Sequence, residues 1–163
     1  MSTKPAALDS TTRIGGAVTH GDAGSAAAAT RYLVPVGRVL FALIFLNAIL
    51  GHFSSQTIGY AAQMGVPMAS LLVPLSGVLA FAGGLSIALG YRARLGAWLV
   101  VAFLVPVSLK MHAFWSQADP MARQLDQVMF FKNLSMLGAA LLIAHFGAGP
   151  LSLDARNRRA VNG

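Results

Sequence analysis

Four long apolar segments dominate this sequence and limit what it can fold into. They cover residues 33–53, 68–89, 95–115 and 128–146. A helix needs roughly 20 apolar residues to cross the ~30 Å hydrocarbon core of a membrane, and each segment is about that long. Inside lipid each segment must be helical, because an open strand would leave backbone N–H and C=O groups unpaired. The sequence therefore predicts an all-α membrane protein, a four-transmembrane-helix bundle.

The composition supports this fold class. The chain of 163 residues is 56% hydrophobic and only 10% charged, whereas an ordinary soluble domain is roughly 25% charged. Its length allows one compact unit. The sequence contains no cysteine, which excludes disulfides, thiol nucleophiles and cysteine-ligated metals within this chain.

The basic residues predict the orientation of the bundle, because lysine and arginine accumulate on the cytoplasmic side of membrane proteins. Arg123 alone falls on the outer side of a four-span arrangement. Eight basic residues fall on the inner side: Lys4, Arg13, Arg31, Arg92, Arg94, Arg156, Arg158 and Arg159. We therefore expect an N-in/C-in, multi-pass protein of a bacterial inner membrane. Nucleic acid is not an expected partner, since these residues form no patch interleaved with aromatic side chains.

Two tails flank the predicted bundle. Residues 1–30 are rich in Ala, Gly, Ser and Thr without apolar periodicity, so we expect a disordered cytoplasmic tail. Residues 31–149 form the membrane domain, and residues 150–163 form a basic cytoplasmic tail. Within the second span, small residues recur every four positions: Ser76, Ala80, Gly84 and Ala88. Such a face favours close helix packing within the chain, and a homo-oligomer seam is the alternative.

Polar residues gather at the predicted outer ends of the spans. Ionisable residues inside a membrane are costly and therefore suggest function. The predicted orientation places six candidates for one polar pocket at similar depth: His52, Lys110, His112, Trp115, Lys132 and Asn133. On the inner side, Arg38 is expected either to reach the interface or to bind carbonyl groups of its own chain. No metal site is expected.

The two lysines of this predicted pocket differ in how easily their side chains can reach the membrane interface. Helical side chains lean toward the N-terminus of their helix, so Lys132 can reach the outer interface, whereas Lys110 leans toward the membrane centre. Lys110 therefore needs a partner, for which Asp126, a quinone, a carboxylate or a lipid headgroup are candidates. Lys110 and His112 are two residues apart, so in a regular helix they point about 200° apart.

His112 has two competing interpretations. It precedes Phe114 and Trp115, and aromatic residues gather at membrane interfaces, which favours an interfacial anchor. A buried hydrogen-bonding role is equally compatible with the pattern. Haem ligation by His52 and His112 is disfavoured, because no motif supports it. No nucleophile, base and acid set is recognisable, so the isolated chain is not expected to be an enzyme.

Several short motifs carry a resemblance to a known family. They comprise Arg38, Leu50-Gly51-His52-Phe53, Gly83 to Tyr91, Arg94, Met111 to Trp115, Phe130 to Leu134 and Gly147 to Asp154. In order and spacing, from Arg38 to Asp154, they resemble the DoxX family of small membrane proteins. One departure is Ala80, where DoxX proteins often carry Glu before the paired glycines.

The resemblance implies a four-helix membrane fold and an association with thiosulfate:quinone oxidation and oxidative-stress redox assemblies. On that basis we expect an accessory or quinone-associated subunit, with membrane redox subunits as partners. Two alternatives remain open. One is a structural or assembly protein that recruits partners. The other is a small-molecule transporter, which is disfavoured because no inverted repeat is recognisable.

Overall fold

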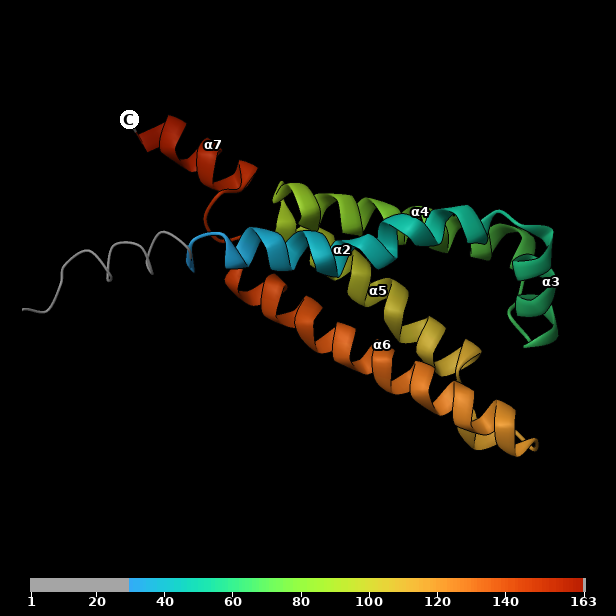
Figure 1. Ribbon diagram of the computed structural model, residues 1–163. Helices are drawn as coiled ribbons and strands as arrows, with labels where there is room; N and C mark the ends of the chain where they lie inside the picture. Colours follow the sequence, from blue (N-terminus) through green and yellow to red (C-terminus); the bar gives the residue numbers. More distant parts are fainter. Residues whose placement is uncertain (1–29, 163) are drawn as a thin grey trace, which may run out of the picture.

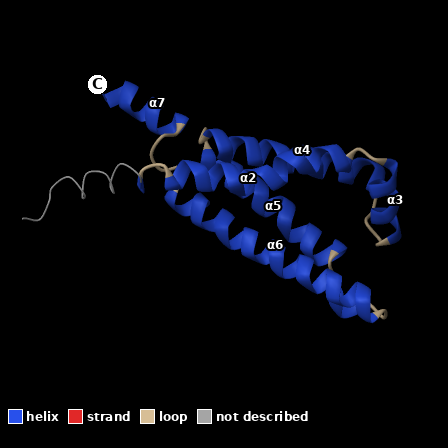
Figure 2. Cartoon of the chain, in the orientation of Figure 1, coloured by secondary structure: helices blue, strands red, loops and turns tan. Residues whose placement is uncertain are grey.

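The computed structural model describes residues 30–162 and shows only helices and connecting segments there (Figure 2). Four helices are long and apolar enough to cross a membrane. They are α2 (Leu33–His52), α4 (Ala69–Leu89), α5 (Ala93–Met111) and α6 (Pro120–Phe146). The described residues therefore confirm the all-α, four-helix fold class. The tail predicted for residues 1–30 lies outside the described residues, apart from Thr30.

Two helix boundaries differ from the predicted ones. α6 begins at Pro120, well before the predicted start at residue 128. Asp119 caps it, because its side chain accepts a hydrogen bond from Ala122 N at 2.7 Å, and proline suits the first helical position. α5 ends at Met111, earlier than predicted, and the chain continues into a short 3-10 helix, η1 (Phe114–Ser116).

Two segments without a predicted helix are helical. The connection after the first span contains α3 (Ser55–Gln63), where the Ser54 side chain accepts a hydrogen bond from Thr57 N. The segment predicted as a basic tail contains α7 (Leu153–Asn162). Ser152 begins it, since its Oγ accepts from Ala155 N at 3.1 Å and donates to Gly149 O at 2.8 Å. Both starts follow the N-cap preference for serine.

The helices pack in a simple order. α2 packs on α4, α4 on α5, and α5 on α6, so α4 and α5 each pack against two other spanning helices. The end of the bundle that carries α7 is called the inner end here, following the predicted orientation. The opposite end, with α3 and η1, is called the outer end. Figure 1 shows α4 and α6 diverging toward the outer end.

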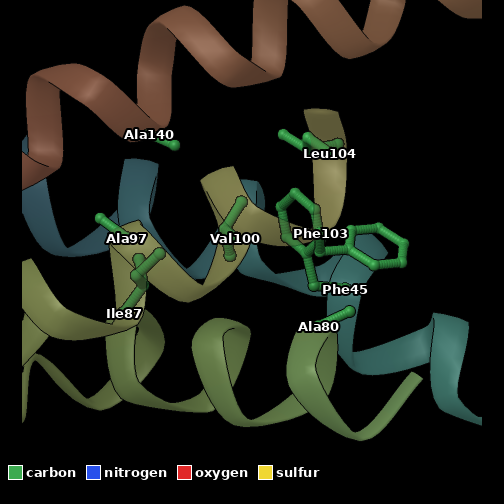
Figure 3. Packing of buried hydrophobic residues seen from close by; sticks show 8 residues of the cluster. All are labelled: Phe45, Ala80, Ile87, Ala97, Val100, Phe103, Leu104 and Ala140. Atoms are coloured by element: carbon green, nitrogen blue, oxygen red, sulfur yellow. The ribbon is translucent and has the colours of Figure 1, made fainter. Parts of the chain in front are cut away.

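The hydrophobic core lies where α4 and α5 meet their neighbours. Its buried side chains come from all four long helices (Figure 3): Phe45, Ala80, Ile87, Ala97, Val100, Phe103, Leu104 and Ala140. Glycines allow the close approaches. A Cβ on Gly84 would meet Phe45 Cβ at 2.9 Å, and one on Gly83 would meet the Gly96 carbonyl oxygen at 2.8 Å. The small residues of α4 thus pack within the chain.

Much of the remaining surface is apolar and exposed. Only 11% of the most apolar part of α6 is buried within the chain, against 33% for α4. In a membrane protein, such a surface faces lipid or a partner. α6 is therefore the spanning helix with the most surface left for contacts outside this chain.

Candidate functional site

A three-residue hydrogen-bonded network holds the outer end together. His112 directly follows α5, Gln117 directly follows η1, and Asp126 lies on α6. His112 Nδ1–H donates to Asp126 Oδ1 at 3.2 Å, and Gln117 Nε2 donates to Asp126 Oδ2 at 2.6 Å. Asp126 is buried, with 8% of its surface exposed. Each carboxylate oxygen thus has a partner, as a buried charge requires.

A histidine oriented by an aspartate can act as a general base, but such a site also needs a nucleophile within reach. The two serines nearest in the sequence are engaged elsewhere. Ser108 Oγ donates to Leu104 O at 2.6 Å, and Ser116 Oγ donates to Ala113 O at 2.7 Å. The contacts that the structure shows join the loop between α5 and α6 to helix α6.

An aromatic cluster lies beside this network. It consists of Phe114, Trp115, Phe130 and Phe131. The Phe114 and Trp115 rings lie 5.1 Å apart, and the Trp115 and Phe130 rings lie 5.6 Å apart, both edge-on, which is a favourable aromatic geometry. Trp115 nevertheless remains 52% exposed. The cluster joins η1 to α6 and presents an aromatic side chain outward.

The residues of the predicted pocket have different partners in the structure. His52 Nδ1–H donates to Ala48 O of its own helix at 2.6 Å. Its ring packs 5.7 Å from the Phe103 ring, and its Cβ lies against Gly77. His52 is therefore a packing residue between α2, α4 and α5, separate from the network around Asp126.

The lysines also differ from the predicted arrangement. Asp126 pairs with His112 and not with Lys110, which is exposed. Lys132 is exposed too, and its Nζ lies 3.0 Å from Met129 Sδ, whereas the neighbouring Asn133 is buried. Helix α5 ends at Met111. His112 therefore lies outside the helix and contacts Asp126 on α6, whereas Lys110 is still within α5.

Sequence reasoning missed Gln117, because its contact depends on the fold of the loop around η1. The Asp119-Pro120 pair was an available signal for the early start of α6. That start places Asp126 in the second turn of a helix, where the loop can reach it.

The inner end is held by a second set of polar contacts. Arg38, only 5% exposed, donates from Nη1 to Ala148 O at 2.7 Å and from Nη2 to Leu151 O at 3.0 Å. The start of α2 and the segment after α6 therefore lie at the same end of the bundle. This agrees with an even number of crossings.

Asp154 fixes the same segment to the turn between α4 and α5. Its Oδ1 accepts from Arg92 N at 2.8 Å and its Oδ2 from Ala93 N at 3.1 Å. Its own backbone N–H donates to Gly90 O at 2.8 Å. The carboxylate thus caps the start of α5, a role the sequence did not suggest because the two partners are about 60 residues apart.

Comparison with known proteins identifies the family. Residues 15–160 match the model of the SURF4 family. Inner membrane protein YqjF of Escherichia coli is 32% identical over 125 residues, which cover 74% of this chain and 88% of that protein. Inner membrane protein YphA of the same organism is 31% identical, covering 79% and 93%. No solved structure is significantly similar.

Some eukaryotic proteins match over shorter stretches. ER-derived vesicles protein ERV29 of Saccharomyces cerevisiae is 27% identical over 81 residues, which cover 50% of this chain and 26% of that protein. The match therefore involves about a quarter of the yeast protein. The two bacterial relatives and the four spanning helices support a multi-pass protein of the inner membrane.

These matches overturn the resemblance to DoxX proteins. The motifs behind that resemblance are short, and several lie at helix ends, where many small bundles need glycine, aromatic and basic residues. The redox role rested on that resemblance and loses its basis, and quinone binding stays an untested prediction. The long match at 15–160, by contrast, covers the whole bundle. The chain belongs to the SURF4 family.

Proposed function

We propose that this chain is a membrane adaptor that binds a polypeptide partner at its outer end and does not catalyse a reaction on its own. The observation that carries this proposal is the tied outer end. There, the polar groups of His112, Gln117 and Asp126 bond to one another, while Trp115 beside them stays exposed. Such an end offers a fixed surface and few free reactive groups.

The exposed surface has the composition of a protein interface. Trp115 is 52% exposed, Met121 74% and Leu125 58%. We call these three residues the outer apolar rim. They lie in η1 and the first two turns of α6. Tryptophan and methionine are enriched in protein interfaces, and tryptophan is common among the residues that contribute most to binding.

The names of these relatives state a location, the inner membrane or vesicles derived from the ER. A simpler role for the rim is anchoring in lipid headgroups, since tryptophan also gathers there. The experiment must therefore separate lipid from protein contacts.

Photocrosslinking in intact cells distinguishes lipid contacts from protein contacts. A photoreactive benzoylphenylalanine replaces Trp115 in one variant and Leu40, 64% exposed on α2, in a control. We expect a polypeptide adduct from position 115 and lipid adducts from position 40. The captured polypeptide is then purified, and its affinity for the full chain in nanodiscs is measured.

The proposal requires saturable binding that weakens at least about tenfold in the double variant Trp115→Ala, Met121→Ala, as expected for central interface residues. Leu40→Ala should bind like the original chain. Lipid adducts alone at position 115, adducts only with a second copy of this chain, or unchanged binding in the double variant would each refute it.

A further inference from the structure

A cavity of about 270 Å³ lies at the inner end, opposite the outer apolar rim. The turn between α4 and α5, the segment after α6 and the helix α7 surround it. The lining residues that matter here are Arg92, Arg94, Leu95, Ala148, Asp154 and Arg158. We call this cavity the arginine pocket.

The charges in the arginine pocket are not balanced. It contains three arginines and one aspartate. Both carboxylate oxygens of Asp154 already accept hydrogen bonds from backbone N–H groups. Among residues 30–162 the structure has one salt bridge, between His112 and Asp126 at the outer end. The arginines of the pocket therefore take no part in a salt bridge within the described residues. The three arginines therefore give the walls of this concave space a net positive charge, and the guanidinium group of Arg92 also lies 5.8 Å from the centre of the Tyr91 ring.

Basic residues on the cytoplasmic side often serve only as topology signals, spread independently along the interface. The arginine pocket differs because its walls are fixed to each other. Arg38 holds the segment after α6 through the carbonyls of Ala148 and Leu151. Asp154 then binds that segment to the start of α5. Arginines from distant parts of the chain are thereby kept around one cavity.

We propose that the arginine pocket binds the phosphate group of an anionic membrane lipid. Guanidinium groups match phosphate oxygens through paired, charge-assisted hydrogen bonds, and basic pockets between helices on the cytoplasmic side suit lipid headgroups. The pocket lies at the ends of the spanning helices, at the level of inner-leaflet headgroups.

The apolar surface beside the pocket identifies lipid as the source of the phosphate. Leu95 lines the cavity and is 53% exposed, and Trp98 is 55% exposed. These residues are three apart on α5, so they share one face of the helix. This face leads from the pocket into the membrane and offers a path for an acyl chain. A free phosphate ion would make no use of it.

Titration of the purified full chain in detergent tests the proposal. Short-chain phosphatidylglycerol, short-chain phosphatidylcholine and inorganic phosphate are each added, and the apparent melting temperature is measured. We expect a saturable rise with phosphatidylglycerol, because a ligand that binds only the folded state stabilises it. Phosphatidylcholine and inorganic phosphate should give a much smaller rise.

Two variants with the same loss of charge locate the site. The pocket variant carries Arg92→Gln, Arg94→Gln and Arg158→Gln. The control variant carries Arg31→Gln, Arg156→Gln and Arg159→Gln, whose side chains do not line the cavity. The pocket variant should bind phosphatidylglycerol at least about tenfold more weakly, since hydrogen bonds to charged groups are the strong ones, while the control keeps its affinity.

Three results would overturn the proposal. Equal weakening in both variants would indicate general surface charge. An equal response to phosphatidylcholine would show that the anion is not recognised, and an equal response to inorganic phosphate would identify free phosphate as the ligand. If the triple variant does not fold, Arg158→Gln alone serves, with bound lipid counted by native mass spectrometry, and unchanged lipid occupancy refutes the proposal.

Discussion

At the residue scale, Gly90 shows how tightly the inner end is packed. It ends α4 with a φ of +64°, a left-handed conformation that glycine adopts easily. A Cβ at this position would lie against Arg38 Nη1 and Ser152 Cβ. Both the backbone conformation and the space around it therefore require glycine.

The substitution Gly90→Ala should destabilise the folded chain by about 2 kcal/mol or more, because the left-handed conformation alone costs a residue with a Cβ roughly 1–2 kcal/mol. The apparent melting temperature in detergent measures the effect. Gly138→Ala in α6 is the matched control, since a Cβ there meets nothing within 4 Å. A similar melting temperature for both variants would show that the inner end is looser than described.

At the element scale, the network around Asp126 connects the end of α5 and η1 to α6. These hydrogen bonds hold α5 and α6 together at the outer end. At this end α6 and α4 diverge (Figure 1). Replacing Asp126 leaves the donors of His112 and Gln117 without their acceptor. Losing the partner of buried polar groups costs about 1–3 kcal/mol.

Asp126→Ala should therefore speed hydrogen–deuterium exchange in residues 112–119 and leave the inner end unchanged. Gln127→Ala, at the exposed neighbouring position, should leave both ends as they are. Exchange that rises equally throughout the bundle would mean that Asp126 supports global stability and not a local tie.

At the scale of the whole molecule, the distribution of charge determines which end faces the cytoplasm. The inner end carries the arginines at the α4–α5 turn and on α7, while the outer end carries Arg123, in the first turn of α6. Since positive charge is retained in the cytoplasm, the outer apolar rim should face away from it and the arginine pocket toward it. Both proposals depend on this orientation.

The absence of native cysteine allows a direct test of orientation with single cysteines. Ala118→Cys lies in the outer loop, and Asn157→Cys lies on α7, both at exposed positions. A membrane-impermeant maleimide should label position 118 in intact cells, and position 157 only after permeabilisation. The reverse labelling pattern would contradict the N-in/C-in orientation.

Local sequence signals mark the starts of several helices, including two helix starts that the prediction did not use. Ser54 and the Asp119-Pro120 pair are ordinary helix starts, yet the segments that they begin were predicted as loop. Residues 55–63 and 120–127 are more polar than the spans. They were therefore not predicted as helical, because the prediction used only the length of apolar segments. The family was missed for a related reason, since short motifs at helix ends recur in unrelated bundles.

The sequence by itself determined the number of spanning helices and their predicted orientation. The physical reason is local, because lipid requires each apolar segment to satisfy its own backbone hydrogen bonds. Only the tertiary structure decided the partners of the polar side chains. Asp126 pairs with His112 instead of Lys110 because α5 ends at Met111. The arginine pocket forms because Arg38 and Asp154 fold the chain after α6 back onto the α4–α5 turn. Such contacts depend on how separate segments of the chain fold back on one another, which no short stretch of sequence specifies.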